Sequence, residues 1–218
     1  MQFWLDTADV RSIKRFSTVG FAYGVTTNPL IISKQSHGPE VLIPELLKAF
    51  DGPLAVQVVG DMTDAMVHQA EKLHELNPRI LVKIPVITEG YAAIAYLTKR
   101  NIPVLATAVF KSQQALIAAS LGATYIAPYI HHMEEQGINS LREIENMQLI
   151  LQNQGLEAEI MGASIKNIAL IQDLAEMGVS HVTLNPEIFE HYFSSFSETA
   201  YANDEFTRNW LDYLEMSA

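Results

Sequence analysis

The stretch Ile80–Val86 reads ILVKIPV and holds one lysine, Lys83, among six apolar residues. Lysine is rarely buried without a partner, because taking its charge out of water costs free energy. Side chains alternate between the two faces of a strand, so Leu81 and Lys83 share one face and Val82 lies on the other. The stretch therefore predicts an interior strand whose amine reaches a polar place in the fold.

Apolar stretches of this kind recur along the chain. The candidate strands are Phe3–Leu5, Gly24–Thr27, Leu54–Val59, Ile80–Val86, Pro103–Val109, Thr124–Ile130, Glu159–Ala163 and His181–Leu184. Most of them are separated by stretches with apolar residues at helical spacing, such as residues 65–76 and 112–119. Strands that alternate with helical patterns predict parallel βαβ units.

Eight such units make a closed (β/α)8 TIM barrel, which we expect as one domain over residues 1–218. The alternative is an open doubly wound sheet, which normally has a glycine-rich turn after its first strand. Here the first strand is followed by DTAD, Asp6–Asp9, a helix-capping pattern. The barrel is therefore favoured. Its lumen is the polar place that Lys83 can reach, since the other face meets apolar helices.

A further helix is expected at the C-terminus, over about residues 200–218. Phe206, Trp210, Tyr213 and Leu214 recur there at helical spacing. A barrel already has its outer ring of helices, so this helix is an extra element. It packs either across its own barrel or on a neighbouring subunit, and large aromatic side chains are typical of interface anchors.

Composition narrows the class of protein. The chain is 49% hydrophobic and 18% charged, which suits a packed domain and not a disordered one. It has no apolar run near the ~20 residues of a membrane span and no signal-peptide pattern, so we expect a cytoplasmic location. The absence of cysteine excludes disulfides and thiolate sites. The net charge of −11 argues against nucleic-acid binding through a broad basic face.

Polar side chains lie at or near the ends of most candidate strands, where TIM barrels form their active sites. They are Asp6, Thr26, Thr27, Asn28, Gln57, Lys83, Thr107, Tyr129, Ser164 and Asn185. Simpler interpretations exist for several of them. Asp6 and Asn28 suit helix caps, the threonines suit strands, and Tyr129 suits an ordinary core aromatic. Their convergence on one end of the barrel is nevertheless the main functional signal.

Lys83 is the strongest member of this set. Its alternative role is a lysine that reaches solvent or pairs with Asp6. A desolvated lysine, however, has a depressed pKa, and its neutral amine can attack a carbonyl to form a Schiff base. The iminium accepts the electrons of a breaking C–C bond. Proton transfers would then come from Asp6, from Tyr129, or from a water held by Gln57, Thr107 and Tyr129.

Seven stretches occur in the order and spacing of a known family. They are WLDTAD, GVTTNP, QV, LVKIPVITEG, ATAVF, APY and GASIKN. The chain resembles the small transaldolase family, and within it the fructose-6-phosphate aldolase subgroup. The resemblance implies a (β/α)8 barrel in which Lys83 forms the Schiff base and Asp6 is the acid–base group. It also implies that Asn28 binds substrate hydroxyls and that Thr107 belongs to the site.

Two positions bear on the subgroup. Transaldolases of the family carry Glu on the third strand and Phe after the sixth, whereas Gln57 and Tyr129 stand here, as in the aldolases. The resemblance thus implies reversible aldol cleavage, with transfer of a dihydroxyacetone unit between sugar phosphates as the alternative. His132 occupies the place of the family's phosphate-binding arginine. Ser164 and Lys166 match the other phosphate-binding residues of the family. Since histidine binds phosphate less strongly than arginine, weaker phosphate binding is expected.

The sequence therefore predicts a class I aldolase, an aldehyde-lyase without metal or organic cofactor. Its catalytic residues would be Lys83, Asp6, Tyr129, Gln57 and Thr107, and its substrate-binding residues Asn28, Thr27, Ser164, Lys166 and His132. The ligand would be a sugar or sugar phosphate, with no nucleic acid or membrane partner. By resemblance the chain forms a homo-oligomer, a pentamer or decamer.

Two other classes of protein stay open. His131, His132 and nearby glutamates could suggest a metal enzyme, although adjacent histidines diverge. A non-catalytic barrel that binds sugar or acts as a scaffold is the third class, but binding alone would not require a buried amine.

Overall fold

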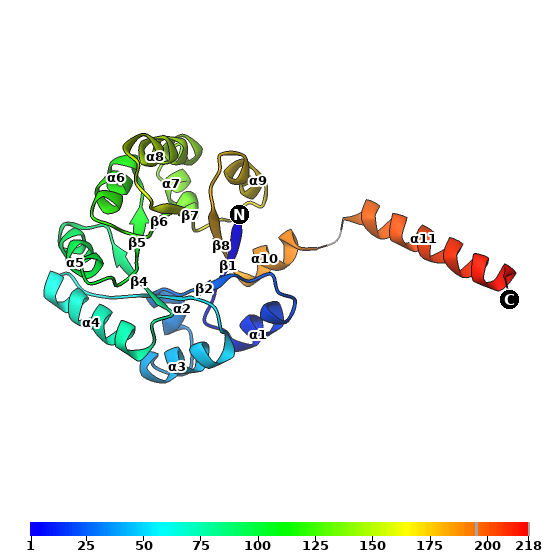
Figure 1. Cartoon of the computed structure of the whole chain (residues 1–218), viewed down its shortest axis with the longest axis horizontal. Helices are drawn as coiled ribbons and strands as arrows, with labels where there is room; N and C mark the ends of the chain where they lie inside the picture. The colour runs from blue at the N-terminus through cyan, green and yellow to red at the C-terminus, as the bar shows by residue number, and fades with distance from the viewer. Residues whose placement is uncertain (195, 218) are drawn as a thin grey trace.

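The computed structural model describes residues 1–194 and 196–217. Within them the strands are β1 (Gln2–Asp6), β2 (Gly24–Thr26), β3 (Leu54–Gln57), β4 (Ile80–Pro85), β5 (Val104–Val109), β6 (Tyr125–Pro128), β7 (Glu159–Gly162) and β8 (His181–Leu184). Each strand pairs in parallel with the next, and the pairing of β8 with β1 closes the barrel. The predicted (β/α)8 barrel is confirmed (Figure 1).

Helices surround the barrel and also extend beyond it. They are α1 (Val10–Thr18), α2 (Pro29–Ser33), α3 (Pro39–Ala49), α4 (Thr63–Leu76), α5 (Thr88–Thr98), α6 (Ser112–Ser120), α7 (Ile130–Glu135), α8 (Ser140–Gln154), α9 (Ala169–Glu176), α10 (Pro186–Tyr192) and α11 (Ser197–Met216). The cap of α1 is Asp9, whose carboxylate accepts from the backbone N–H groups of Arg11 and Ser12. Asp6 is therefore free of the capping role and can serve the lumen.

Alternation along β4 divides the interior into two clusters. Leu81 belongs to a lumen cluster, whose other buried members are Trp4, Ala55, Leu105, Ala127, Met161 and Ala163. Val82 and Ile84 belong to the outer cluster between strands and helices. Since Lys83 shares its face with Leu81, the apolar lumen cluster lies under the lysine and closes it off from water on that side.

The end of the barrel opposite the strand exits is closed by a hydrogen-bonded aromatic group. The Trp4 indole N–H donates to Nδ1 of His181 at 3.0 Å, and His181 Nε2 lies 3.0 Å from Glu159 Oε2. Because Nδ1 accepts, Nε2 carries the proton and donates to the carboxylate. Burial lowers the pKa of His181, while Glu159 opposes this shift. A neutral histidine thus seals this end.

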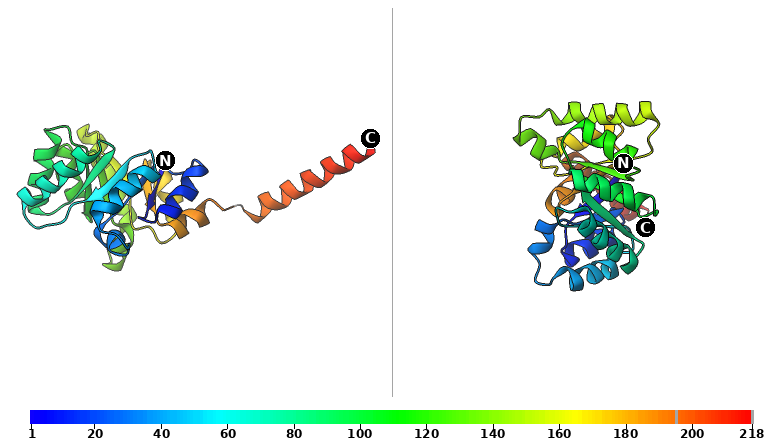
Figure 2. Two further views of the ribbon diagram at one scale, coloured as in Figure 1. Left: turned by 90° about the horizontal axis from the view of Figure 1, so that it is seen from below. Right: turned by 90° about the vertical axis from the view of Figure 1, so that its left-hand side faces the viewer.

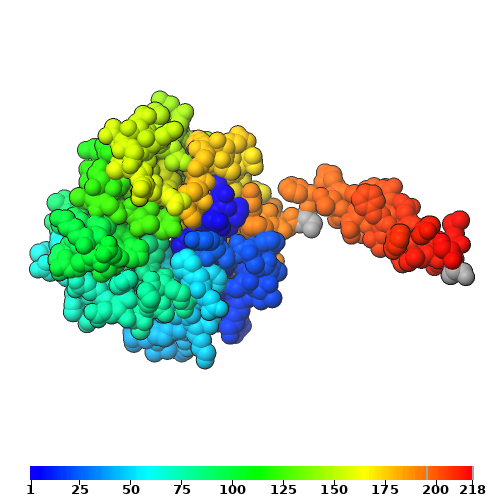
Figure 3. All heavy atoms as spheres, in the orientation of Figure 1, coloured from blue at the N-terminus to red at the C-terminus, as the bar shows by residue number. Residues whose placement is uncertain are grey.

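The C-terminal helix α11 stands away from the barrel, as Figures 1, 2 and 3 show. None of its described residues is buried, and Trp210 and Phe206 are 60% and 71% exposed. In this structure the helix does not form a layer on its own barrel. No described helix combines the length and apolar character needed to cross a membrane.

Candidate active site

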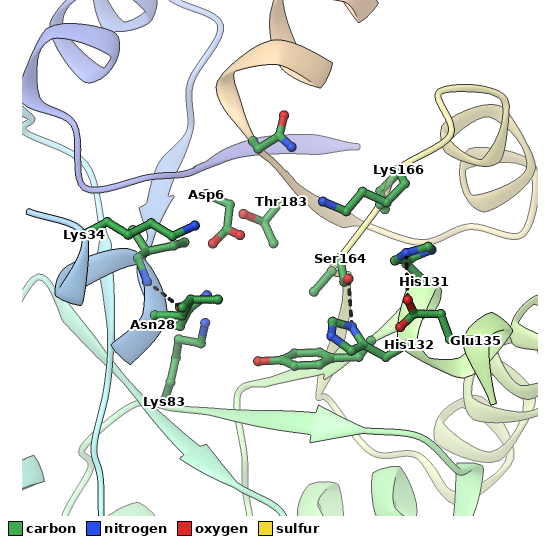
Figure 4. A pocket seen from close by; sticks show the side chains of 16 residues that line it. Asp6, Asn28, Lys34, Lys83, His131, His132, Glu135, Ser164, Lys166 and Thr183 are labelled. Atoms are coloured by element: carbon green, nitrogen blue, oxygen red, sulfur yellow. Dashed lines mark hydrogen bonds and ion pairs between the residues drawn. The ribbon is translucent and has the colours of Figure 1, made fainter.

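A cavity of about 460 Å³ opens at the carboxyl ends of the strands (Figure 4). Its walls include seven of the ten predicted site residues: Asp6, Asn28, Lys83, Tyr129, His132, Ser164 and Lys166. The other lining residues are Leu30, Ile31, Lys34, His131, Glu135, Ala163, Ile165, Thr183 and Asn185. Residues distant in sequence meet here because a closed parallel barrel gathers all its strand ends on one rim.

Lys83 lies at the bottom of this cavity with 5% of its surface exposed. Its ammonium nitrogen donates to the backbone carbonyl of Thr27 at 2.8 Å. Among the described residues it forms no ion pair with a carboxylate. Burial lowers the pKa of Lys83 below its ordinary 10.5, and the charge of Asp6 only partly opposes this. Lys83 is thus almost fully buried and lacks a carboxylate partner among the described residues, so its charged form is disfavoured.

A chain of hydroxyls holds the Asp6 carboxylate. Thr26 Oγ1 donates to Asp6 Oδ1 at 2.7 Å and lies 2.6 Å from the hydroxyl of Thr183. A hydroxyl has one proton, and Thr26 gives it to Asp6, so Thr183 must donate to Thr26. Thr183 was not among the predicted site residues. Its only sequence signal is a polar residue inside the apolar strand β8.

Tyr129 faces the cavity with its hydroxyl held by a neighbouring strand. Thr107 Oγ1 donates to the Tyr129 hydroxyl at 3.0 Å, and Thr107 itself is fully buried. Burial raises the pKa of Tyr129 above its ordinary 10.0, the hydrogen bond from Thr107 lowers it, and the charge of Asp6 raises it. The phenol therefore stays protonated near neutral pH, and its own O–H is free to donate into the cavity.

Three predicted site residues do not line this cavity: Thr107, which donates to Tyr129, and also Gln57 and Thr27. Gln57 pairs with Lys83 in the strand register and lies on the lumen face with Ala55, although it also borders a groove between α3 and α4. Its Oε1 atom is buried with no hydrogen-bond partner among the described residues. Thr27 uses its hydroxyl to donate to the Ala55 carbonyl at 2.9 Å. Its backbone carbonyl, not its hydroxyl, accepts the hydrogen bond from Lys83.

Two asparagines at strand exits share one local design. Asn28 and Asn185 are each followed by proline, and each accepts a backbone N–H into its side-chain oxygen at 2.9 Å to cap a short helix. This fixes the orientation of both amides. Since the oxygen is used for capping, the side-chain NH2 group remains to donate at the cavity wall. The capping interpretation of Asn28 and its predicted binding role are thus compatible.

The far end of the cavity is rich in basic groups. Ser164 Oγ lies 2.9 Å from His132 Nδ1, and His131 Nε2 lies 3.4 Å from Glu135. Lys166 and Lys34 line the wall from opposite sides in Figure 4. Sequence reasoning missed Lys34, because one lysine on an exposed helix end gives no signal of its own. The two lysines bring positive charge to opposite walls of the cavity in a chain of net charge −11.

Over residues 1–194 and 196–217, no group of three or more His, Asp or Glu side chains is placed to hold a metal ion. The two adjacent histidines have separate partners, Glu135 for His131 and Ser164 for His132. The predicted independence from metal stays a prediction.

A model of the family described as Transaldolase/Fructose-6-phosphate aldolase matches residues 3–213. The chain belongs to this family. It is 40% identical over 194 residues to "Probable transaldolase 2" of Listeria monocytogenes, with 89% of each chain covered. "Probable transaldolase" proteins of Streptococcus agalactiae and Streptococcus pyogenes are 35% and 37% identical, covering 89% and 87% of this chain and 90% and 88% of theirs. The family predicted from seven sequence motifs is confirmed.

A solved structure described as a lactate oxidase of Pediococcus acidilactici is similar in fold, with a TM-score of 0.61. The sequences are 13% identical, and the likeness covers 88% of this chain and 65% of that one. At this identity the likeness concerns the barrel alone. Family membership, by contrast, makes the chain an enzyme of the aldolase type.

Lys83→Met should stabilise the protein near pH 7, by roughly 0.5–2 kcal/mol, because it removes an amine whose desolvation opposes folding. Between the lowered pKa of Lys83 and the ordinary 10.5, the unfolded chain holds a proton that the native chain has lost. The free energy of unfolding of the native sequence therefore rises with pH in this window. Urea unfolding at several pH values should show the advantage of the variant shrinking as pH approaches 10.5. The exposed Lys166→Met is the matched control; a pH-independent difference for Lys83→Met would contradict the burial argument.

Proposed function

We propose that this enzyme is a class I aldolase in which Lys83 forms a Schiff base with the C2 carbonyl of a ketose. The observation that carries the proposal is the buried amine without a carboxylate partner, at the bottom of a cavity lined by Asp6 and Tyr129. The amine attacks the carbonyl carbon, and the carbinolamine loses water to give an iminium. A base takes the proton of the C4 hydroxyl, the C3–C4 bond breaks, and its electrons pass into the iminium to give an enamine.

The leaving fragment is an aldehyde, glyceraldehyde 3-phosphate if the substrate is fructose 6-phosphate. Protonation of the enamine at C3 and hydrolysis of the iminium then release dihydroxyacetone and restore the amine. Asp6, oriented by Thr26, suits the role of base. Tyr129, held by Thr107, suits the proton donor. Gln57 would join them only through a water, since its orphaned Oε1 has no protein partner among the described residues.

The rest of the cavity suits the two ends of a sugar. We assign the amide of Asn28 to a substrate hydroxyl near the Schiff base, and Ser164, Lys166 and His132 to the distal phosphate. Thr27 supports the lysine through its carbonyl and is given no substrate contact. Cytoplasmic location stays a prediction from the sequence.

Transaldolase activity is the second candidate function. It is favoured by the relatives' names, "Probable transaldolase". In that reaction the enamine attacks the aldehyde carbon of an aldose acceptor and is not protonated at C3. The protonated phenol of Tyr129 favours the aldolase, because a donor beside the enamine speeds its protonation and release.

A product assay with fructose 6-phosphate separates the two functions. We expect free dihydroxyacetone to form without any aldose phosphate acceptor, and we expect Lys83→Met to lose this activity while keeping its circular dichroism spectrum. A strict requirement for acceptor would instead mean transaldolase. Full activity of Lys83→Met would overturn the Schiff-base mechanism.

His132→Arg should tighten binding of phosphorylated substrate, because arginine is always charged and can form a bidentate pair with phosphate. We expect KM for fructose 6-phosphate to fall roughly tenfold, since bidentate charge-assisted hydrogen bonds to phosphate are among the strong ones. KM for unphosphorylated fructose is the control and should not change. An equal change in both values would show that His132 does not contact the phosphate.

We infer that α11 packs on a second copy of the chain. Its exposed Phe206, Trp210, Tyr213 and Leu214 lie at helical spacing and share a face that water covers in the single chain. The groove between α3 and α4 offers apolar wall residues, Ile43, Pro44 and Leu73 among them, on the barrel of each copy. With α11 of each copy in the groove of the next, this head-to-tail contact can close into a ring, as in a pentamer or a decamer of two rings.

Light scattering tests the assembly directly. The full chain should have the mass of a pentamer or decamer, and Phe206→Glu with Trp210→Glu should reduce it to that of one chain. Asn209→Glu on the same helix is the control and should leave the mass unchanged. A monomeric wild-type chain would contradict the inference.

A further inference from the structure

Two residues three positions apart, Thr107 of β5 and Phe110 just after it, both lie against Tyr129. Thr107 donates its hydroxyl to the phenol at 3.0 Å. The Phe110 ring, just past the end of β5, lies 6.2 Å from the Tyr129 ring at an interplanar angle of 55°. Side chains three apart on a regular strand point to opposite faces. The alternation of β5 must therefore break between Thr107 and Phe110.

The break is a one-residue bulge. Ala106 pairs with Ile126 and Val109 pairs with Pro128, so β5 advances three residues while β6 advances two. Ala108 occupies the extra position with φ of +58°, in the left-handed region that residues with a Cβ rarely adopt. On the other side of β5 the ladder continues, since Val86 N–H donates to the Thr107 carbonyl at 3.1 Å.

The bulge changes which side chains face the site. Leu105 belongs to the lumen cluster and Thr107 contacts Tyr129, so regular alternation would put Val109 on the same wall. Val109 instead belongs to the outer cluster and is fully buried there. The bulge thus keeps the isopropyl group of Val109 away from the site and turns the Phe110 ring toward the tyrosine.

We propose that the left-handed bulge at Ala108 is a positioning device that sets the phenol of Tyr129 for proton transfer. This rests on the proposed aldolase function, in which Tyr129 protonates the enamine. Ala108 touches no reacting atom; it acts by letting Thr107 fix the hydroxyl while Phe110 supports the ring. Glycine adopts this left-handed backbone conformation at least as readily as alanine. A β-branched side chain at position 108 would strongly disfavour the same conformation.

Ala108→Val and Ala108→Gly form the first test, with fructose 6-phosphate cleavage as the assay. We expect Ala108→Val to lower kcat about tenfold or more with KM nearly unchanged, because general-acid catalysis is lost and the binding residues are untouched. Ala108→Gly should stay within about twofold of the wild type. Asn101→Val is the matched control, since Asn101 has φ of 60° at the turn before the same strand, outside the cavity wall. It should lower stability and leave kcat unchanged.

A double-mutant cycle with Tyr129→Phe distinguishes positioning from general damage. If Ala108 acts through the phenol, Ala108→Val should cause little further loss of kcat in the Tyr129→Phe background. Phe110→Leu does not alter the bulge backbone, and it too should cause little further loss of kcat in the Tyr129→Phe background. This second variant tests the proposal even if Ala108→Val does not fold. Wild-type kcat in Ala108→Val, or losses that multiply fully in the cycles, would overturn the proposal.

Trapping of a ketone on Lys83 by borohydride reduction tests the proposed aldolase function separately from the proposal for the bulge. Retained trapping in Ala108→Val with lowered kcat supports the positioning role. A wild-type chain that traps ketone while the bulge variants keep full kcat overturns the bulge inference alone. A wild-type chain that neither traps ketone nor cleaves the sugar overturns both.

Discussion

The rest of the site depends on keeping one amine out of water. Lys83 is held by the Thr27 carbonyl alone among the described protein groups, and its charge is disfavoured by burial. Burial of the amine requires apolar side chains beneath it in the lumen, and Trp4 and Leu81 are among them. It also requires strands closed into a ring, so that water cannot enter from the side. An open sheet would leave the same lysine at a wetter edge, where an ordinary ammonium is stable.

The closed ring also explains how residues from distant strands come to line one cavity with Lys83. Asp6 and Tyr129 lie on β1 and after β6, yet both line the cavity of Lys83 on β4. Each is fixed by a hydroxyl from an adjacent strand, Thr26 for the carboxylate and Thr107 for the phenol. Strand register therefore sets where the carboxylate and the phenol lie, and our proposal for the bulge in β5 follows from this dependence.

Much of this could be predicted from the sequence, since apolar strands, a lysine inside one of them and polar strand exits are local patterns. The family follows from motifs that extend along almost the whole chain. Other features are set only by three-dimensional neighbours. The contact of Thr183 with Thr26 can be predicted only once it is known that β8 pairs with β1. That the Gln57 Oε1 atom has no hydrogen-bond partner among the described residues is known only from the packed interior. The bulge at Ala108 is invisible in ATAVF, because alanine gives no sign of a left-handed backbone.

The central claim is that Lys83 is a nucleophile that forms an iminium with a ketone. The most direct measurement is mass spectrometry of peptides after borohydride reduction in the presence of dihydroxyacetone. The account predicts that the Lys83 peptide gains the mass of the ketone less one oxygen, and that the Lys166 peptide at the cavity mouth gains none. An unmodified Lys83 peptide under conditions in which the enzyme cleaves sugar would contradict it.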